Sequence, residues 1–176
     1  THDQSSAASD VYKRQIDYSV LEINDLEHFK GKKIVVAKNL INSLSKECGI
    51  DDYKELKTFK GSEFKGTICS HPFKKMNFDY DVPMLEAQFV NLEQGTGIVH
   101  CAPSHGPDDF NLCLKNNIPS LYTVDNAGLY TKEIPYFTNI HIFKADPIVI
   151  EKLKEQKKLL KSDKLNHSYP HSWRSK

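Results

Sequence analysis

The apolar residues of this chain stand in short runs that glycine, proline or polar residues interrupt. The stretch from Ile16 to Val20 alternates apolar and polar residues, and this period of two predicts a strand. A second apolar run over 34–37 predicts another strand. The apolar positions of 40–48 then recur at helical spacing and end at Gly49, where a C-terminal glycine cap belongs. The core therefore begins with two strands and a helix.

The rest of the chain divides into further short elements. The residues Asn126-Ala127-Gly128 between two apolar runs indicate a hairpin, and Asp146-Pro147 marks a helix start, with Asp at the N-cap. Further strands are expected within 53–69 (two), 84–91, 98–100, 121–124, 129–131 and 140–143, and further helices over 108–116 and 146–160. About eight strands and three helices predict an α+β domain with a β-barrel-like core and helices at its rim.

The chain is long enough for one domain with a hydrophobic core, since it has 176 residues. Residues 1–15 lack apolar periodicity and are interpreted as a flexible or foreign leader. Residues 16–160 are expected to form the domain. The polar and aromatic stretch 161–176 is interpreted as a linker that leads away from it.

Charge and cysteine content narrow the class of protein. The net charge of +1, from 24 Lys+Arg and 23 Asp+Glu, argues neither for nor against a polyanion partner. The four cysteines show no CxxC spacing and are expected to be reduced thiols of a cytoplasmic protein. No apolar run approaches the roughly 18 residues of a membrane span, and no signal peptide is visible. We expect a monomer without a membrane partner.

One run, GTGIVHCAPSHGPDDF, is dense in residue types that carry out chemistry. His100, His105 and Asp109 could hold a metal, although their spacing matches no established metal signature and no fourth ligand is evident. Cys101 could act as a nucleophile with a histidine, although adjacent residues of a strand point to opposite faces. Otherwise the run is a rigid loop in which Asp108 or Asp109 satisfies the first amides of a helix. The residues alone leave these alternatives open.

The same run resembles the hallmark of isoleucyl-tRNA synthetase editing domains, which typically read GTG-x-VH-x-APGHG-x-DD followed by an aromatic residue. The chain departs from it at Cys101, where threonine is common, and at Ser104, where glycine is common. The resemblance extends over residues 16–176. Valyl- and leucyl-tRNA synthetases share the domain but usually lack the combined motif. Further stretches that resemble the family, in the right order, are HPF, VPMLEAQFV, LEQGTG, IHIFKADPIVIEKL and HSYPHSWRSK.

The resemblance implies hydrolysis of tRNA(Ile) mischarged with valine, Val-tRNA(Ile). The synthetase core excludes valine poorly because one methylene gives about 1–3 kcal/mol of discrimination, a range for which isoleucyl-tRNA synthetase is itself the standard example. Asp109 matches the family's anchor for the substrate ammonium group, and His100 matches the residue that lines the side-chain pocket and excludes isoleucine. The other substrate-binding candidates are Gly95, Thr96 and Gly97, whose turn permits close approach to the terminal adenosine, together with His105 and Asp108.

The resemblance implies no metal and no cofactor in this domain, because an aminoacyl ester is already activated and its attacking water mainly needs positioning. ATP and Mg²⁺ are expected for the synthetase core, whose HIGH and KMSKS-type motifs this sequence does not contain. The expected partners are the 3′ end of tRNA(Ile) and the remainder of the synthetase chain.

The family's threonine-rich pocket wall, resembling TTTPWT, is not found upstream of Ile16. The alternative is a catalytically inert fragment or an RNA-binding module. His71 and His141 are interpreted as structural.

Overall fold

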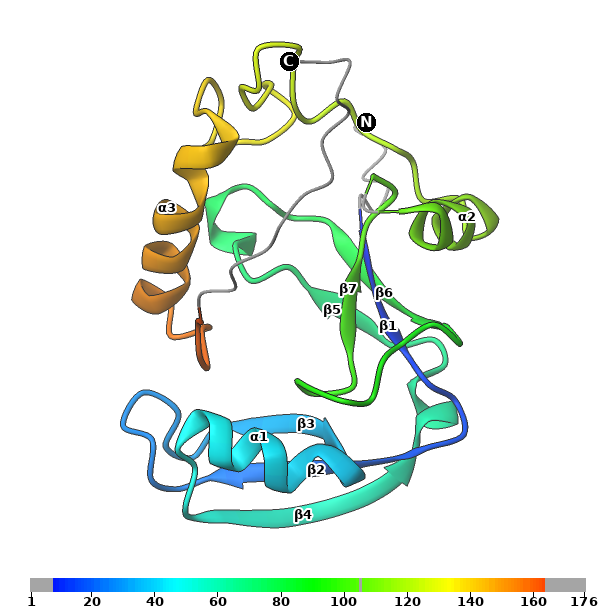
Figure 1. Ribbon diagram of the computed structural model, residues 1–176, viewed down its shortest axis with the longest axis vertical. Helices are drawn as coiled ribbons and strands as arrows, with labels where there is room; N and C mark the ends of the chain where they lie inside the picture. The colour runs from blue at the N-terminus through cyan, green and yellow to red at the C-terminus, as the bar shows by residue number, and fades with distance from the viewer. Residues whose placement is uncertain (1–7, 105, 164–176) are drawn as a thin grey trace, which may run out of the picture.

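The computed structural model describes residues 8–104 and 106–163. Within them, the strands form a four-stranded sheet of order β5-β6-β1-β7 and a three-stranded sheet of order β3-β2-β4 (Figure 1). The strands are β1 (Ser9–Tyr12), β2 (Asp17–Ile23), β3 (Lys33–Ala37), β4 (Tyr53–Lys60), β5 (Ile68–Ser70), β6 (Asp81–Glu86) and β7 (Val99–Cys101).

The four-stranded sheet is mixed. Strand β1 runs parallel to β6 and antiparallel to β7, and β5 runs antiparallel to β6. The register of β1 and β7 places Asp10 opposite His100. The chemically dense run of the sequence therefore includes the edge strand β7, whose histidine lies opposite a residue of the neighbouring strand.

The three-stranded sheet carries a helix on one face. A 3₁₀ turn, η1 (Lys38–Leu40), leads into α1 (Ile41–Cys48), as the helical spacing predicts. The helix ends at Gly49, whose φ of 68° is the left-handed conformation that glycine adopts without a steric cost. The apolar face of α1 packs on β2 and β3 in a core that includes Tyr18, Leu21, Ile23, Val36, Leu40, Ile41 and Leu44.

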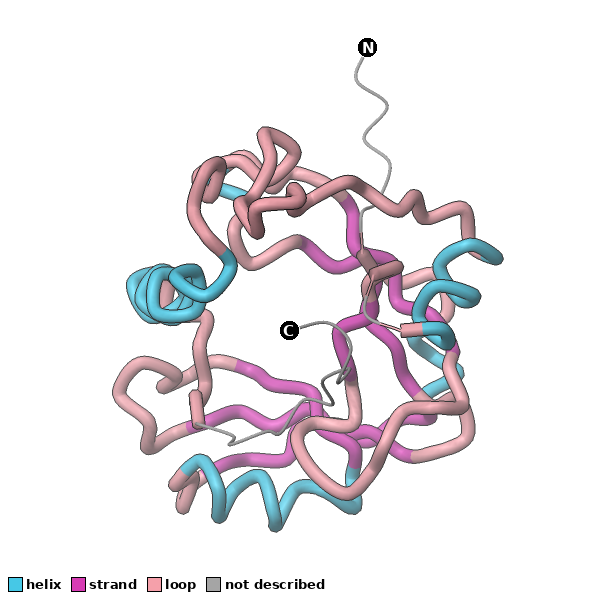
Figure 2. The backbone as a smooth tube through the Cα atoms, turned by 45° about the horizontal axis from the view of Figure 1, so that its top comes forward, coloured by secondary structure: helices cyan, strands magenta, loops and turns pink. Residues whose placement is uncertain are grey.

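Two longer helices flank the four-stranded sheet. Helices α2 (Pro107–Lys115) and α3 (Ile142–Glu155) lie on opposite sides of the molecule (Figures 1 and 2). Helix α2 packs through Cys113 on a small core beside β7. Helix α3 packs on a group of three buried rings, the aromatic cluster, which comprises Phe73, Phe78 and Phe137. The 3₁₀ turns η2 (Gly61–Phe64) and η3 (Lys74–Met76) complete the described elements.

The prediction of a flexible or foreign leader over residues 1–15 is wrong for Ser9–Tyr12. These residues form β1, which lies between β6 and β7, and Val11 is completely buried. Four residues are too few to display a recognisable period, and the strand is stabilised by backbone hydrogen bonds to segments more than 70 residues away. Residues 164–176, most of the predicted linker, lie outside the described residues.

The predicted start of the last helix is also wrong. Helix α3 begins at Ile142, so the expected strand over 140–143 does not form and Pro147 lies inside the helix. The cap is His141, whose Nδ1 accepts a hydrogen bond from the Phe143 amide at 3.3 Å. A histidine side chain thus provides the cap that the sequence pattern assigned to Asp146.

Strand β6 and the hairpin differ from the prediction in detail. The predicted 84–91 strand begins earlier, at Asp81, and contains Pro83. The missing amide hydrogen of Pro83 is tolerated because pairing with β1 starts only at Met84. The predicted hairpin forms a turn in which the Gly128 amide bonds the Asp125 carbonyl at 3.0 Å, but its arms make only isolated bridges.

The described strands do not close into a barrel, so the β-barrel-like core is not confirmed. The two sheets share no strand pairing within 8–104 and 106–163, and each keeps two edge strands. The α+β class with three α-helices is confirmed. In the same part of the chain, none of the helices has the length and apolar character needed to cross a bilayer.

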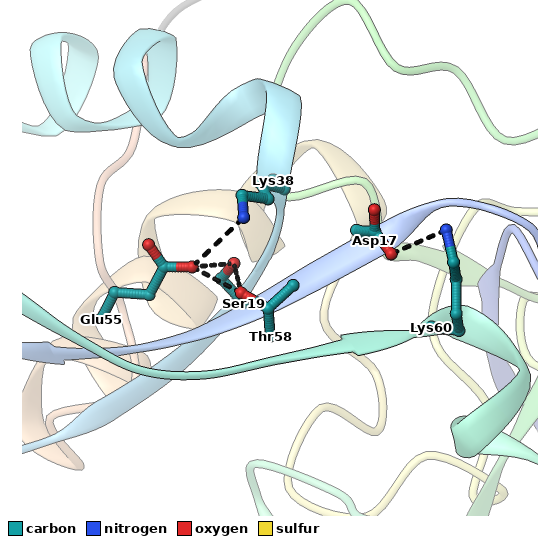
Figure 3. A network of polar contacts seen from close by, with 6 residues as sticks. All are labelled: Asp17, Ser19, Lys38, Glu55, Thr58 and Lys60. Atoms are coloured by element: carbon teal, nitrogen blue, oxygen red, sulfur yellow. Dashed lines mark hydrogen bonds and ion pairs between the residues drawn. The ribbon is translucent and has the colours of Figure 1, made fainter.

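A polar network lies on the three-stranded sheet (Figure 3). The hydroxyls of Ser19 and Thr58 both donate to Glu55 Oε1, at 2.7 and 2.6 Å, and Lys38 lies 4.0 Å from the same oxygen. The hydrogen bonds from Thr58 and then Ser19 hold the pKa of the Glu55 carboxyl below its usual value. The network satisfies the hydroxyl of Ser19, which is fully buried between β3 and β4.

The turn before β7 connects the two sheets. The carbonyl of Thr96 accepts from the Ala37 amide at 2.8 Å, and the carbonyl of Gly97 accepts from the Tyr18 hydroxyl at 2.9 Å. Gly97 is buried with φ of 74°, and a Cβ at this position would lie 2.6 Å from the Cβ of Ala37. Glycine is therefore required there both for its backbone conformation and for the close approach of the two sheets.

Gly97→Ala should lower the free energy of unfolding by about 2–4 kcal/mol, since left-handed strain of about 1–2 kcal/mol adds to overpacking. Gly95→Ala is the matched control, because Gly95 has a similar φ of 72° but a methyl group there would meet no packed neighbour within 4 Å. Gly95→Ala should lower the free energy of unfolding only by the backbone strain of about 1–2 kcal/mol. Urea denaturation of both variants measures the difference, and equal losses would show that the contact with Ala37 is unimportant.

Candidate functional site

A cavity of about 660 Å³ lies between the four-stranded sheet, the aromatic cluster and the loops around α3. Most of its wall comes from three parts of the chain, with Ala8 and Val149 completing it. The HPF segment and the residues after it contribute His71, Phe73, Phe78 and Tyr80, the end of β7 contributes His100 and the loop 102–104, and the α2–α3 connection contributes Tyr130, Ile134 and Phe137. The volume falls in the usual range for small-molecule sites, roughly 300–1,000 Å³.

His100 reaches this cavity from the middle of β7. Its side chain is 55% exposed, and its Nδ1 lies 3.8 Å from a carboxylate oxygen of Asp10 on the paired strand. The next residue, Cys101, points to the other face and is completely buried. The alternation expected of a strand thus separates His100 from Cys101.

Cys101 belongs to the core beside α2. Its Sγ lies 3.8 Å from Sγ of Cys113, and both residues are buried free thiols. Burial raises the pKa of the Cys101 thiol to about 12, and hydrogen bonding to Asp109 also favours the neutral form. A thiol of this kind is a poor nucleophile at neutral pH. All four cysteines of the sequence are free in the structure, and the reduced state of their thiols stays a prediction.

Asp108 and Asp109 occupy the first turn of α2, where negative charge is stabilised by the helix dipole. The N-cap is Gly106, and no side chain caps this helix, so the interpretation of either carboxylate as a cap is wrong. Asp108 is exposed and Asp109 is partly buried, beside Cys101. Neither carboxylate lines the cavity that contains His100.

The remaining residues that the sequence suggested for substrate binding are three residues of one turn and His105. Gly95, Thr96 and Gly97 form the turn that joins the sheets, and they do not line the cavity. His105 lies outside the described residues. Across the described ranges, no group of three or more His, Cys, Asp or Glu side chains could hold a metal ion.

His71 is a cavity residue that the sequence pattern indicated only as structural. Its ring stacks on Phe78, with centroids 5.0 Å apart and planes at 19°, and its Nδ1 accepts from the Phe73 amide at 3.1 Å. Burial, and secondarily the nearby His100, lower the pKa of His71 from 6.5 to about 4. The HPF segment was the available signal, but nothing in it placed His71 beside His100.

The depressed pKa of His71 gives a pH prediction. The unfolded chain binds a proton near pH 6.5 and the folded chain near pH 4, so stability is fully present above about pH 6.5 and falls as the pH drops toward 4. The free energy of unfolding should fall by roughly 1–3 kcal/mol over this range. A pKa shift corresponds to about 1.36 kcal/mol per unit, and solvent in the cavity screens the charge and reduces that value.

NMR titration of the imidazole Cε1 proton of His71 provides the direct measurement, with the pH dependence of urea unfolding alongside. His71→Phe should remove this component of the pH dependence. A midpoint near 6.5 in the folded protein would contradict the assignment of a desolvated, neutral ring.

Comparisons with known proteins connect this geometry to a family. Residues 23–162 match the family model of the leucyl-tRNA synthetase editing domain. The chain is 65% identical over 166 residues to the isoleucine–tRNA ligase of Pelagibacter ubique, covering 94% of this chain and 18% of that protein. It is 37% identical over 181 residues to that of Gluconobacter oxydans, covering 94% and 19%, and 41% identical over 162 residues to that of Brevibacillus brevis, covering 92% and 16%.

A solved structure shows the same fold. The chain superposes on the crystal structure of GlLeuRS-CP1 with a TM-score of 0.62 and 14% sequence identity, covering 96% of this chain and 80% of that one. The chain spans less than a fifth of the length of the ligases from Pelagibacter ubique and Brevibacillus brevis, at 18% and 16%.

Proposed function

We propose a hydrolytic role for this chain, which belongs to the aminoacyl-tRNA synthetase editing-domain family as a segment of an isoleucine–tRNA ligase. The proposed substrate is Val-tRNA(Ile), whose ester between valine and the terminal ribose is cleaved. The observation that carries the proposal is the cavity of about 660 Å³ with His100, from the GTGIVH run, in its wall.

The proposed reaction is addition of water to the ester carbonyl carbon. The bond to the ribose oxygen then breaks, that oxygen takes up a proton, and valine leaves. An aminoacyl ester is already activated, so the domain mainly has to position water and ester. The step needs no cofactor, while ATP and Mg²⁺ would serve ligation in the remainder of the protein.

Asp109 is proposed to anchor the α-ammonium group of the substrate. Its place in the first turn of α2, the helix that follows the cavity loop 102–104 in the chain, supports this role. A carboxylate that accepts from an ammonium group makes a charge-assisted hydrogen bond, which provides both affinity and orientation. Asp109 is outside the cavity wall in the structure, so the substrate would have to extend along the loop toward α2 to reach it.

His100 is proposed to set the size of the amino-acid pocket. Its imidazole stands at the cavity wall on a paired strand, where backbone hydrogen bonds hold it. A side chain in such a position excludes isoleucine through its volume, since overpacking a fixed site by one methylene costs about 1–3 kcal/mol.

The proposed partners are the 3′ end of tRNA(Ile) and the remainder of the ligase chain, in the cytoplasm. The activity is best tested in the Pelagibacter ubique ligase carrying this segment in place of its own, because the two are 65% identical over 166 residues. Deacylation of Val-tRNA(Ile) by this hybrid, with none after the segment is deleted, is the expected result. A hybrid that charges tRNA but does not deacylate it would favour the inert or RNA-binding alternative.

Asp109→Asn in the hybrid should lower kcat/KM for Val-tRNA(Ile) deacylation roughly tenfold to a hundredfold. A hydrogen bond to a charged group contributes about 1.5–3 kcal/mol, and 1.36 kcal/mol corresponds to a factor of ten in rate. Asp108→Asn is the matched control, because the neighbouring carboxylate is exposed on the same helical turn. If Asp108→Asn abolishes deacylation while Asp109→Asn retains it, the two roles are exchanged.

His100→Ala should weaken discrimination between Val-tRNA(Ile) and Ile-tRNA(Ile) by roughly tenfold to a hundredfold, the rate equivalent of about 1–3 kcal/mol of steric exclusion. Deacylation of both esters by the hybrid gives the ratio. Val99→Ala is the control, since Val99 is an exposed neighbour on β7 that does not line the cavity. If His100→Ala hydrolyses both esters at the wild-type rates, His100 does not set the size of the amino-acid pocket.

A further inference from the structure

The ring of His71 is fixed in the cavity wall by its aromatic neighbours. It stacks on Phe78, and its centroid lies 5.1 Å from the ring of Tyr80 and 5.8 Å from that of Phe73. Rings packed on several sides retain little rotational freedom, so the direction of each ring nitrogen is set by the fold.

The two nitrogens of His71 have different surroundings. Nδ1 accepts from the Phe73 amide at 3.1 Å, so in the neutral ring the proton is assigned to Nε2. Within the described residues, Nε2 has no hydrogen-bond partner. It is also not among the buried polar side-chain atoms left without a partner. Nε2 is therefore accessible, and the cavity that His71 lines provides the access.

An uncharged His71 imidazole does not repel a substrate that carries a positive charge. Two titratable side chains influence the pKa of His71: His100 on β7 lowers it, and Asp10 on β1 raises it. Burial decides the balance, and the low pKa keeps the ring uncharged at neutral pH. A neutral imidazole can donate a hydrogen bond without repelling an α-ammonium group nearby, whereas a lysine or an imidazolium could not.

We propose that His71 is a substrate-binding residue of the editing site, whose Nε2–H donates a hydrogen bond to an uncharged oxygen at the aminoacyl-ribose end of the tRNA. The inference rests on the proposed function, and it adds a residue from the HPF segment to the site. His71 lines the same cavity as His100, so one wall would combine steric exclusion with a fixed donor. The bond is made in the ground state, and its loss therefore raises KM more than it lowers kcat.

Binding of a stable substrate analogue tests the inference directly. The probe is 3′-deoxy-3′-(L-valylamino)adenosine, in which an amide replaces the ester, and calorimetric titration of the chain with it gives Kd. His71→Phe keeps an aromatic ring in the cluster but removes the donor, and it should raise Kd about tenfold, the usual effect of one neutral hydrogen bond. His71→Gln retains an N–H donor and should recover most of the affinity.

His141→Phe is the matched control. His141 accepts the amide of the residue two positions later, as His71 does, but it caps α3 and does not line the cavity. It should leave Kd unchanged. Thermal melting verifies that each variant is folded, and one-bond ¹H–¹⁵N NMR of the imidazole should show the Nε2–H tautomer of His71 and a shift of that signal on adding the probe.

Three results would overturn the inference: an unchanged Kd in a folded His71→Phe, an equal loss in His71→Gln and His71→Phe, or no binding of the probe to the wild-type chain. Deacylation by the ligase hybrid decides the proposed function separately. A hybrid that hydrolyses Val-tRNA(Ile) and loses this activity in Asp109→Asn, but has the same KM in His71→Phe, would retain the function and remove His71 from the site.

Discussion

The position of the candidate site depends on the contact between the Gly95–Gly97 turn and the three-stranded sheet. Two carbonyls of the turn accept hydrogen bonds, one from the Ala37 amide and one from the Tyr18 hydroxyl. Because Gly97 has no side chain, the turn approaches Ala37 at a distance that a methyl group would block. The turn leads directly into β7, so this contact also fixes the strand that carries His100 to the cavity.

The wall of the cavity that lies opposite β7 is held by aromatic packing rather than by backbone pairing. Phe73 and Phe78 flank η3, Phe137 comes from the α2–α3 connection, and the three rings pack against α3. His71 belongs to this packing through its stacked ring, which explains both its fixed direction and its low pKa. The cavity is thus held between a hydrogen-bonded strand and an apolar cluster, and its two histidines experience different degrees of burial.

Residues of the GTGIVHCAPSHGPDDF run lie in two regions of the structure, the cavity and the small core beside α2. Alternation along β7 directs His100 to the cavity and Cys101 to the core with Cys113. Helix α2 then begins at Pro107, and its first turn carries two carboxylates of unequal exposure. The run therefore combines a structural role, which stabilises β7 and α2, with the candidate chemical role of residues that face outward from this core.

The sequence by itself determined the elements whose signals are local. The helix over 41–48 follows from apolar spacing and a glycine cap, helix α2 from the pattern over 108–116, and the family from the run that starts at Gly95. Only the tertiary structure decided that Ser9–Tyr12 is a central strand, that α3 begins at a histidine cap, and that the sheets stay open. It also decided that His71 joins His100 at one cavity. These features depend on partners distant in the chain, and a local pattern carries no information about which distant segments will pair, pack or exclude water from a side chain.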